Sequence, residues 1–323
     1  MTETQTRLRE YEADLVIDSY RTVAEDVVEL TLTHPAGEPL PAWTPGAHID
    51  LILSDDITRQ YSLCGSPADA SSFKVGILKA PDSRGGSRQV HEALQAGATV
   101  RVRGPRNHFS LVAAPRYVFI AGGIGVTPML PMIAEAEASG AQWTLLYGGR
   151  SVESMAYYDD LAKYGDRVTF LPGNDIALMS AALDERLGIP QPDTLVYTCG
   201  PEGLLGAVEG RCAAWPDGAL HLERFAAKAV EGAVDEEFEV VLARSGLTIK
   251  VPADTSIFRA AENAGISVLG SCHEGICGTC ETVILEGEAD HRDSVLSDSE
   301  KDSQETMMIC VSRCKTGPLV IDL

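Results

Sequence analysis

The segment CHEGICGTC at residues 272–280 places three cysteines within nine residues. Together with Cys310 they give the spacing C-x4-C-x2-C, then 29 residues, then a fourth cysteine. Zinc ribbons and fingers usually show two C-x2-C pairs or a late histidine pair, and only one such pair is present here. Disulfides suit a cytosolic chain poorly. The pattern therefore favours an iron–sulfur cluster, and its spacing is that of plant-type 2Fe–2S sites.

The residues around these cysteines suit a tight loop that must point three thiolates at one small object. Small residues flank or separate the cysteines: Gly270, Ser271, Gly275 and Gly278. Cys310 lies in the strand-like run MMICVS and is expected to bring the fourth ligand from behind. Of the other cysteines, Cys64 and Cys212 are predicted to be small buried hydrophobes, and Cys314 is predicted to lie outside the ligand set.

Length and composition bound the possible functions. The 323 residues predict two or three domains. A formal charge of −21 argues against a nucleic-acid partner, which would require basic patches. Residues 117–134 carry no charge, but three glycines and two prolines interrupt them, which predicts a buried strand, a loop and a helix rather than a membrane span. The N-terminus has no apolar core typical of a secretory signal, so we expect a soluble, cytoplasmic protein with no membrane partner.

Three domains are predicted along the chain. Residues 1–112 contain many short strand patterns and one plausible helix, which predicts a closed antiparallel β-barrel. In residues 113–228 short apolar strands alternate with helical patterns, as is typical of a doubly wound parallel sheet. Residues 229–323 begin with the rest of a small, polar linker. They continue with a hairpin, a short helix that stops at Gly265, and the cysteine segment.

The motif RQYSLCG at residues 59–65 ends a predicted strand of the barrel. Arg59 can neutralise a phosphate, while Tyr61 and Ser62 can meet a flat heteroaromatic ring. An arginine and a tyrosine on a strand more often simply face solvent, so this motif alone is a weak signal.

The motif SRGGSRQVHEAL at residues 83–94 strengthens the interpretation. It is a glycine turn that opens a helix. The main-chain N–H groups of Gly85, Gly86 and Ser87, with the start of the helix, make a site for an anion.

Two further motifs join a buried strand to a helix. In AGGIGVTPML (121–130) the glycines let a ligand approach the backbone, although the G-x-G-x-x-G fingerprint and its later acidic residue are missing. In CGPEG (199–203), Gly200 leaves room for a ring and Pro201 suits the first helical turn. Each motif alone could be an ordinary turn, but four in this order predict a site for a flavin and a nucleotide.

The order R-x-Y-S, G-G-S, G-G-I-G-x-T-P, C-G-P and a plant-type ferredoxin tail resembles the phthalate dioxygenase reductase family. Its members are ferredoxin-reductase-like proteins that carry FMN. The resemblance covers nearly the whole chain, including EGEADHRDSVLSDSEK (286–301) and the terminal LVIDL. It implies an FMN-binding barrel, an NAD(P)H-binding α/β domain and an α+β ferredoxin domain of the β-grasp type.

The resemblance also implies roles for individual residues. FMN would be bound by Arg59, Gln60, Tyr61 and Ser62, with Gly85, Gly86 and Ser87 on its phosphate and Phe225 stacked on its ring. The nicotinamide and pyrophosphate site would comprise Gly122, Gly123, Gly125, Cys199, Gly200 and Pro201, and Thr127 would lie beside the flavin ring. Thr127 and Cys199 are the candidate catalytic residues. The cluster would be held by Cys272, Cys277, Cys280 and Cys310.

The choice between NADH and NADPH stays open. Arg150 and Ser151 stand where related proteins make this choice, and such a pair could accept a 2′-phosphate. The habit of the family favours NADH. Asp175 is a weaker candidate for contact with the adenosine ribose.

The cofactors suggest an order of electron transfer. NADH gives a hydride, which is two electrons at once, whereas a 2Fe–2S cluster accepts one, so a flavin must stand between them. The resemblance implies the reductase component of a two-component oxygenase, with a Rieske non-haem iron oxygenase as partner in aromatic acid hydroxylation or O-demethylation. A reductase for a haem-thiolate monooxygenase and a non-catalytic iron–sulfur electron carrier stay open as alternatives. Residues 236–323 hold seven basic and sixteen acidic residues, a charge of −9, which suits either a basic partner surface or mere solubility.

Overall fold

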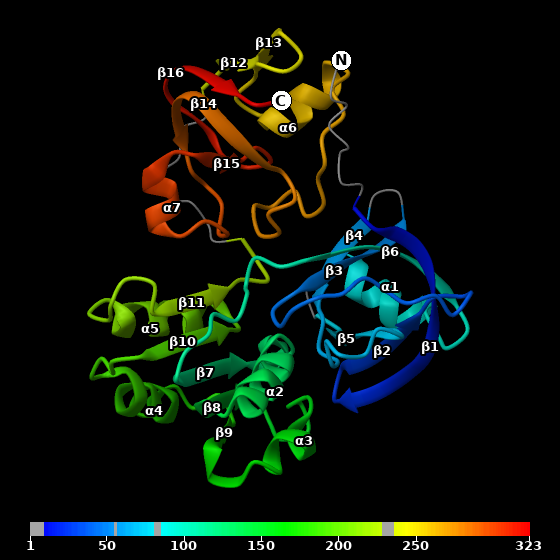
Figure 1. The fold of residues 1–323 in the computed structure, drawn as a ribbon, viewed down its shortest axis with the longest axis vertical. Coiled ribbons are helices and arrows are strands. Elements are labelled where there is room, and N and C mark those ends of the chain that lie inside the picture. Colours follow the sequence, from blue (N-terminus) through cyan, green and yellow to red (C-terminus); the bar gives the residue numbers. More distant parts are fainter. Residues whose placement is uncertain (1–9, 55–56, 81–84, 228–235) are drawn as a thin grey trace. The chain divides into compact units, whose positions relative to one another are not determined.

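The computed structural model describes residues 10–54, 57–80, 85–227 and 236–323. These residues form two compact units, Met1–Glu223 and Arg224–Leu323. The first unit contains an antiparallel sheet and a parallel sheet, and the second contains a mixed sheet (Figure 1). The predicted linker falls largely on residues 228–235, outside the described residues. The boundaries near residues 112 and 228 stay predictions.

The antiparallel sheet of the first unit forms the predicted barrel. Its elements are β1 (Glu12–Ala24), β2 (Val27–Thr33), β3 (His48–Ser54), β4 (Ile57–Ser62), β5 (Ser72–Leu78), α1 (Gly86–Ala93) and β6 (Thr99–Arg106). The strands follow the order β4-β3-β6-β1-β2-β5, and every paired strand is antiparallel. A bridge between Leu63 and Val75 joins the end of β4 to β5, which brings the two edges of the sheet together. Alternate side chains of these strands fill the interior, including Leu15, Ile17, Leu30 and Ile49.

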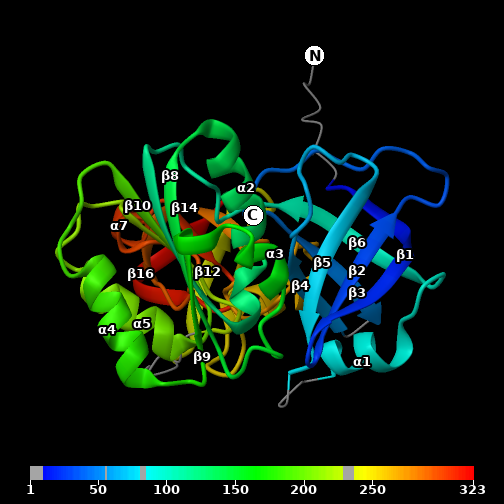
Figure 2. The ribbon, with the colours of Figure 1, turned by 90° about the horizontal axis from the view of Figure 1, so that it is seen from below.

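The second sheet of the first unit is parallel throughout. Its elements are β7 (Arg116–Gly122), η1 (Gly123–Val126), α2 (Met129–Ser139), β8 (Gln142–Gly149), α3 (Tyr158–Ala162), η2 (Gly165–Arg167), β9 (Val168–Pro172), α4 (Ile176–Leu187), β10 (Thr194–Cys199), α5 (Glu202–Cys212) and β11 (Leu220–Glu223). The order is β11-β10-β7-β8-β9, and the doubly wound prediction is confirmed. Phe119 of β7 packs in one core with α2 and α3, and Ile120 packs in another with α4 and α5. Helices therefore cover both faces of the sheet (Figure 2).

One helix of this sheet is shorter than predicted. The sequence ESMAYYDDLAKYG at residues 153–165 predicts a helix, but α3 holds only Tyr158–Ala162. Tyr157 at its start has a φ of 59°, a left-handed conformation that no α-helix continues through. The uncharged stretch 117–134 forms β7, η1 and the start of α2, as predicted. Within the described residues, no helix is both long enough and apolar enough to cross a membrane.

The second unit is built on a five-stranded mixed sheet. Its elements are β12 (Phe238–Leu242), β13 (Leu247–Val251), α6 (Ile257–Asn263), β14 (Glu281–Asp290), α7 (Asp298–Ser303), β15 (Thr306–Met308) and β16 (Arg313–Ile321), in the order β13-β12-β16-β14-β15. The predicted hairpin is β12–β13, with Val240 and Leu242 fully buried and Phe238 half-buried. The prediction that Cys310 lies on a strand is wrong, because β15 ends at Met308 and Cys310 occupies the following turn.

Candidate functional site

The start of α1 lies against Arg59 of β4. A Cβ atom added at Gly86 would stand 2.5 Å from Cγ and 2.8 Å from Nε of Arg59. Gly85, at the N-cap, has a φ of 97°, which side chains rarely allow. The hydroxyl of Ser87 accepts a hydrogen bond from the main-chain N–H of Ala80 at 3.2 Å and so braces the turn. The guanidinium of Arg59 and the first N–H groups of α1 thus lie close together, and both favour the binding of an anion there.

Gln60 of the same strand belongs to a buried ionic network. Its Nε2 atom donates a hydrogen bond to Oδ1 of Asp50 at 3.1 Å. Asp50 is completely buried, and Nε and Nη2 of Arg103 donate to its other oxygen at 3.1 Å and 3.0 Å. Arg106 also binds this carboxylate. Gln60 is therefore fixed by Asp50, which Arg103 and Arg106 bind in turn. Sequence analysis had not connected these residues, because they are far apart in the sequence.

The end of β4 meets the carboxyl ends of β10 and β11. The hydroxyl of Ser62 donates to Oε2 of Glu223 at 3.5 Å. Cys199 is the register partner of Glu223 on the neighbouring strand. Burial raises the pKa of Glu223 to about 8, so its carboxyl is mainly protonated at neutral pH. Burial, and then Glu223 itself, also raise the pKa of Cys199 well above its ordinary value.

Tyr61 and Phe225 are two further residues that were predicted to bind the flavin. Burial raises the pKa of Tyr61 to about 12, which keeps its hydroxyl neutral. Phe225 is the second residue of the second unit and is 42% exposed. Its stacking on the flavin stays a prediction. Glu223 was missed by sequence analysis, although an acidic residue that ends a short strand two positions before Phe225 was a possible signal.

The two predicted nucleotide loops pack backbone against backbone. A side chain at Gly125 would overlap the carbonyl group of Cys199. A Cβ atom at Gly122 would stand 2.6 Å from Cδ of Pro201, and one at Gly200 would stand 2.9 Å from the nitrogen of Gly122. β7 and β10 are parallel neighbours, so their carboxyl ends lie at one edge of the sheet. This is the edge at which open α/β sheets bind ligands.

Thr127 lies where this edge meets the barrel. It follows η1, which Gly123 opens, and it is buried. Its hydroxyl donates to the carbonyl oxygen of Ile124 at 2.9 Å. Its methyl carbon would stand 2.9 Å from a Cβ atom added at Gly76 of β5. The structure therefore brings Thr127 against the barrel, beside the strands that frame the predicted flavin site.

The residues predicted to choose the coenzyme follow β8. Nη2 of Arg150 lies 3.8 Å from Oδ2 of Asp26, in the turn between β1 and β2. The hydroxyl of Ser151 accepts a hydrogen bond from the main-chain N–H of Ser154 at 3.3 Å. Asp175 caps α4, because its carboxylate accepts a hydrogen bond from the first turn of that helix at 3.0 Å.

The four predicted cluster ligands form one contiguous group. Cys272 shares hydrogen bonds with Cys277 and Cys310, which lower the pKa of Cys272. Cys310 also bonds to Cys280 and lowers the pKa of Cys280. The same contacts, with burial, raise the pKa values of Cys277 and Cys310. The turn after β15 therefore does bring the fourth cysteine to the other three.

The loop winds so that main-chain and side-chain donors reach the thiols. His273 and Gly275 have φ values of 56° and 67°. The main-chain N–H of Glu274 donates to Sγ of Cys272 at 3.3 Å, and the hydroxyl of Thr279 lies 3.1 Å from Sγ of Cys277. Such donors stabilise thiolates.

This donor set fits a 2Fe–2S cluster. A two-iron cluster needs two thiolates for each iron, and these four neighbouring cysteines can supply them. Cys314 stands apart, since its thiol donates to the carbonyl oxygen of Gly317 at 3.3 Å.

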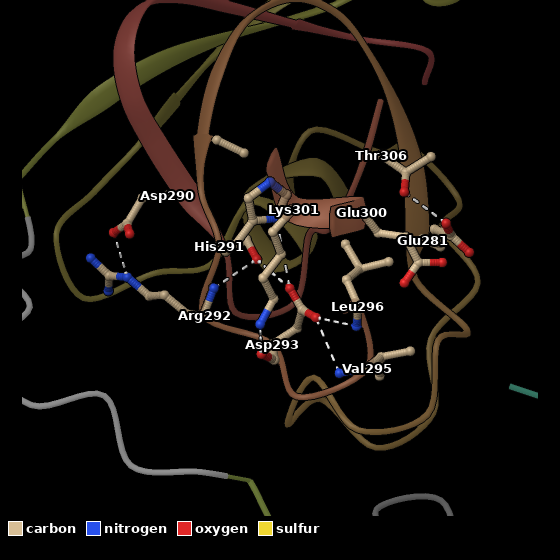
Figure 3. A network of polar contacts seen from close by, with 12 residues as sticks. Glu281, Asp290, His291, Arg292, Asp293, Val295, Leu296, Glu300, Lys301 and Thr306 are labelled. Atoms are coloured by element: carbon tan, nitrogen blue, oxygen red, sulfur yellow. Dashed lines mark hydrogen bonds and ion pairs between the residues drawn. The ribbon is translucent and has the colours of Figure 1, made fainter. Parts of the chain in front are cut away.

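A buried carboxylate organises the segment that follows β14 (Figure 3). Asp293 accepts hydrogen bonds from the main-chain N–H groups of Val295 and Leu296 at 3.1 Å and 2.8 Å. Nζ of Lys301 donates to the main-chain carbonyl of Asp293 at 2.8 Å. Nδ1 of His291 lies 3.7 Å from its carboxylate, and both of these side chains are nearly or fully buried.

Asp293 lies between the two segments that carry the cysteines. The N–H of Ser294 donates to the carbonyl oxygen of Gly275 at 2.9 Å, and a Cβ atom at Gly275 would stand 3.0 Å from Cα of Asp293. The hydroxyl of Ser312, two residues after Cys310, lies 3.5 Å from Oδ1 of Asp293. This segment therefore links the three-cysteine loop to the turn of the fourth cysteine.

Comparison with known proteins gives two family matches. Residues 240–315 match the family described as 2Fe-2S iron-sulfur cluster binding domain. Residues 119–210 match the family described as oxidoreductase NAD-binding domain. The chain is also 44% identical over 307 residues to the phenoxybenzoate dioxygenase subunit beta of Ectopseudomonas oleovorans, which covers 93% of this chain and 94% of that protein.

Two solved structures are similar over almost the whole chain. The structure of phthalate dioxygenase reductase shares 34% identity with a TM-score of 0.71, covering 97% of this chain and 98% of that one. An intact type IV self-sufficient cytochrome P450 monooxygenase shares 43% identity with a TM-score of 0.90. That match covers 97% of this chain but only 41% of the monooxygenase chain, so this chain corresponds to less than half of it.

Proposed function

The chain belongs to the phthalate dioxygenase reductase family and is an NAD(P)H-dependent iron–sulfur oxidoreductase, and from this premise we propose that it is the reductase of a two-component oxygenase. Its cofactors are FMN, NADH and a 2Fe–2S cluster. When bound, FMN would accept a hydride from NADH, and the cluster would pass on single electrons. The acceptor that we propose is a Rieske non-haem iron oxygenase that hydroxylates or O-demethylates an aromatic acid.

The observation that carries the proposal is the convergence of Cys272, Cys277, Cys280 and Cys310 on a chain that also holds the flavin and nucleotide elements. Arg59 and the start of α1 bind the FMN phosphate through charge and N–H groups. The glycine loops let the dinucleotide approach the edge of the parallel sheet closely. These residues bind and orient FMN and the dinucleotide. Hydride transfer between the two needs no acid–base pair of side chains.

Polar groups with little exposure line the predicted site where the two rings would meet. Thr127 and Cys199 are buried, and Glu223 is half-buried. The protonated carboxyl of Glu223 and the hydroxyl of Ser62 can hold a hydrogen bond there without adding a charge. A neutral lining of this kind favours transfer of a hydride over the leakage of protons.

A haem-thiolate monooxygenase is the second candidate for the acceptor. The similarity of this chain to part of a self-sufficient cytochrome P450 monooxygenase favours it. We also propose that the protein works in the cytoplasm, where cysteines that form no disulfide stay reduced.

Purified protein tests the proposal. We expect it to be yellow-brown, to release FMN on boiling, and to reduce ferricyanide and cytochrome c with NADH. A non-catalytic carrier would contain the cluster without flavin and would ignore NADH. The acceptor is then identified by adding a Rieske oxygenase or a haem-thiolate enzyme and measuring NADH-dependent product formation. If neither enzyme turned over, the proposed partner would be wrong, whereas colourless protein without NADH oxidation would refute the whole relay.

A further inference from the structure

Two turns of the first unit meet beyond the carboxyl end of β8. The main-chain N–H of Glu25, in the β1–β2 turn, donates to the carbonyl oxygen of Glu153 at 2.7 Å. The next residue, Asp26, has a φ of 59°, and its carbonyl oxygen accepts a hydrogen bond from the N–H of Lys79 at 2.7 Å. These two main-chain bonds fix the position of Asp26 relative to the loop that carries Arg150.

Carboxylates approach both of the residues in this loop that could receive a phosphate. Oδ2 of Asp26 lies 3.8 Å from Nη2 of Arg150, and both side chains are about half exposed. Hydrogen bonds from the main chain and from the Ser151 hydroxyl lower the pKa of Glu153, which stays anionic. One arginine therefore stands against two carboxylates, so Arg150, Asp26 and Glu153 together carry no net positive charge.

The position of this loop indicates which part of a dinucleotide it meets. β8 is the neighbour of β7, and the glycine loop after β7 is the candidate pyrophosphate site. In nucleotide-binding α/β sheets, the end of the next strand meets the adenosine ribose. An acidic residue there accepts the 2′-hydroxyl of NADH, and a nearby arginine accommodates the 2′-phosphate of NADPH. Arg150 alone would therefore favour NADPH.

We propose that Asp26, which the barrel contributes to the nucleotide domain, selects against NADPH by neutralising Arg150 and repelling a 2′-phosphate. The inference rests on the proposed function, which supplies the dinucleotide. A 2′-hydroxyl is neutral and meets no such repulsion. A phosphate on Arg150 would stand a few ångströms from the Asp26 carboxylate, and at such distances each pair of like charges matters even in water. We expect Asp26 to lower the affinity for a 2′-phosphorylated dinucleotide by a factor on the order of ten, and we expect this factor to shrink as the salt concentration rises.

The test compares 2′,5′-ADP with 5′-ADP as probes, titrated calorimetrically into the full-length protein with its cofactors bound. Asp26→Asn removes the charge, and asparagine tolerates the left-handed backbone at this position. Glu25→Gln is the matched control, because it removes a carboxylate from the same turn without changing Asp26. We expect Asp26→Asn to raise the preference for 2′,5′-ADP over 5′-ADP about tenfold at low salt, and much less at about 0.5 M salt.

Glu25→Gln should shift this preference less than about twofold at either salt concentration. Adding Arg150→Gln to Asp26→Asn should abolish the gain, because the released guanidinium is its source. The ratio of kcat/KM for NADPH to that for NADH should rise in parallel in Asp26→Asn. An unchanged preference in Asp26→Asn, or a gain that survives Arg150→Gln, would overturn the inference. Wild-type protein that bound neither probe nor NADH would instead overturn the proposed function, and the inference with it.

Discussion

The hydroxyl of Ser62 lies 3.5 Å from Oε2 of Glu223, so the strand that carries the flavin motif and the last strand of the parallel sheet share a hydrogen bond. The bond joins two sheets whose contributing residues are 161 positions apart in the sequence. Burial raises the pKa of Glu223 to about 8. The stability of this unit should therefore depend on pH in a way that a single substitution can reveal.

Glu223→Gln should remove a loss of stability that develops as the pH rises from about 4.3 to about 8. The pKa of Glu223 in the folded protein, about 8, lies above the value of about 4.3 for an exposed glutamate. The folded state therefore holds the proton over this interval, so the contribution is fully present below about pH 4.3 and disappears as the pH rises through 8. The loss is at most about 5 kcal/mol. Thermal unfolding from about pH 5 to pH 9 should show it in the wild type and much less of it in the variant.

Glu135→Gln is the control, because Glu135 lies exposed on α2. Its melting temperatures should follow those of the wild type at every pH. Parallel curves for wild type and Glu223→Gln would show that Glu223 does not titrate in this range, and the prediction would then be wrong.

Gly86→Ala should weaken the binding of FMN. The added Cβ atom would stand 2.5 Å from Cγ of Arg59, so the arginine side chain must move away from the start of α1. A displaced guanidinium loses a charge-assisted contact to phosphate, for which about 1.5–3 kcal/mol is typical. Ultrafiltration should recover more free FMN from this variant than from the wild type. Gly206→Ala, on α5, meets nothing within 4 Å and should retain its flavin. Equal retention in both variants would contradict the predicted phosphate site.

Asp293→Ala should reduce the cluster content of the protein. The substitution leaves the N–H groups of Val295 and Leu296 without their acceptor, at about 1–3 kcal/mol for each buried group that stays unsatisfied. It also loosens the segment between Gly275 and Ser312. Iron per chain should fall, and the visible absorbance of the remaining cluster should decay faster. Asp293→Asn keeps one carbonyl oxygen for the N–H groups and should restore most of the iron. If the alanine variant held its cluster as tightly as the wild type, Asp293 would have no positioning role.

Local patterns in the sequence were sufficient to predict the three kinds of sheet and a 2Fe–2S domain, whereas the four cluster ligands stay a prediction. Alternating strands and helices predicted the parallel sheet, and the spacing of Cys272, Cys277 and Cys280 predicted the iron–sulfur site. The glycines of the nucleotide loops were recognisable because close backbone approach excludes every larger residue. These features depend on neighbours within a few tens of residues.

Features that depend on tertiary contacts were missed. Glu223 acquires its raised pKa only because β11 lies beside β10 and the end of β4. The pairing of Asp26 with Arg150 joins residues that are more than a hundred positions apart. The helix after Ser154 was predicted too long, because nothing in its composition indicated the left-handed backbone at Tyr157. Apolar MMICVS suggested a strand at Cys310, but the ligand must leave the sheet to reach the loop of the other three cysteines.

Cys310→Ser should separate the two reductase activities. Cys310 is buried and contacts Cys272 and Cys280, so its loss removes one of four cluster ligands without disturbing the first unit. NADH-dependent reduction of ferricyanide, which can draw electrons directly from the flavin, should stay largely intact. Reduction of cytochrome c, which needs single electrons from the cluster, should be abolished. Cys314→Ser, four residues away with its thiol bonded to Gly317, should leave both activities unchanged. Equal loss of both activities in Cys310→Ser would contradict the proposed order, because the cluster would then be needed before the flavin.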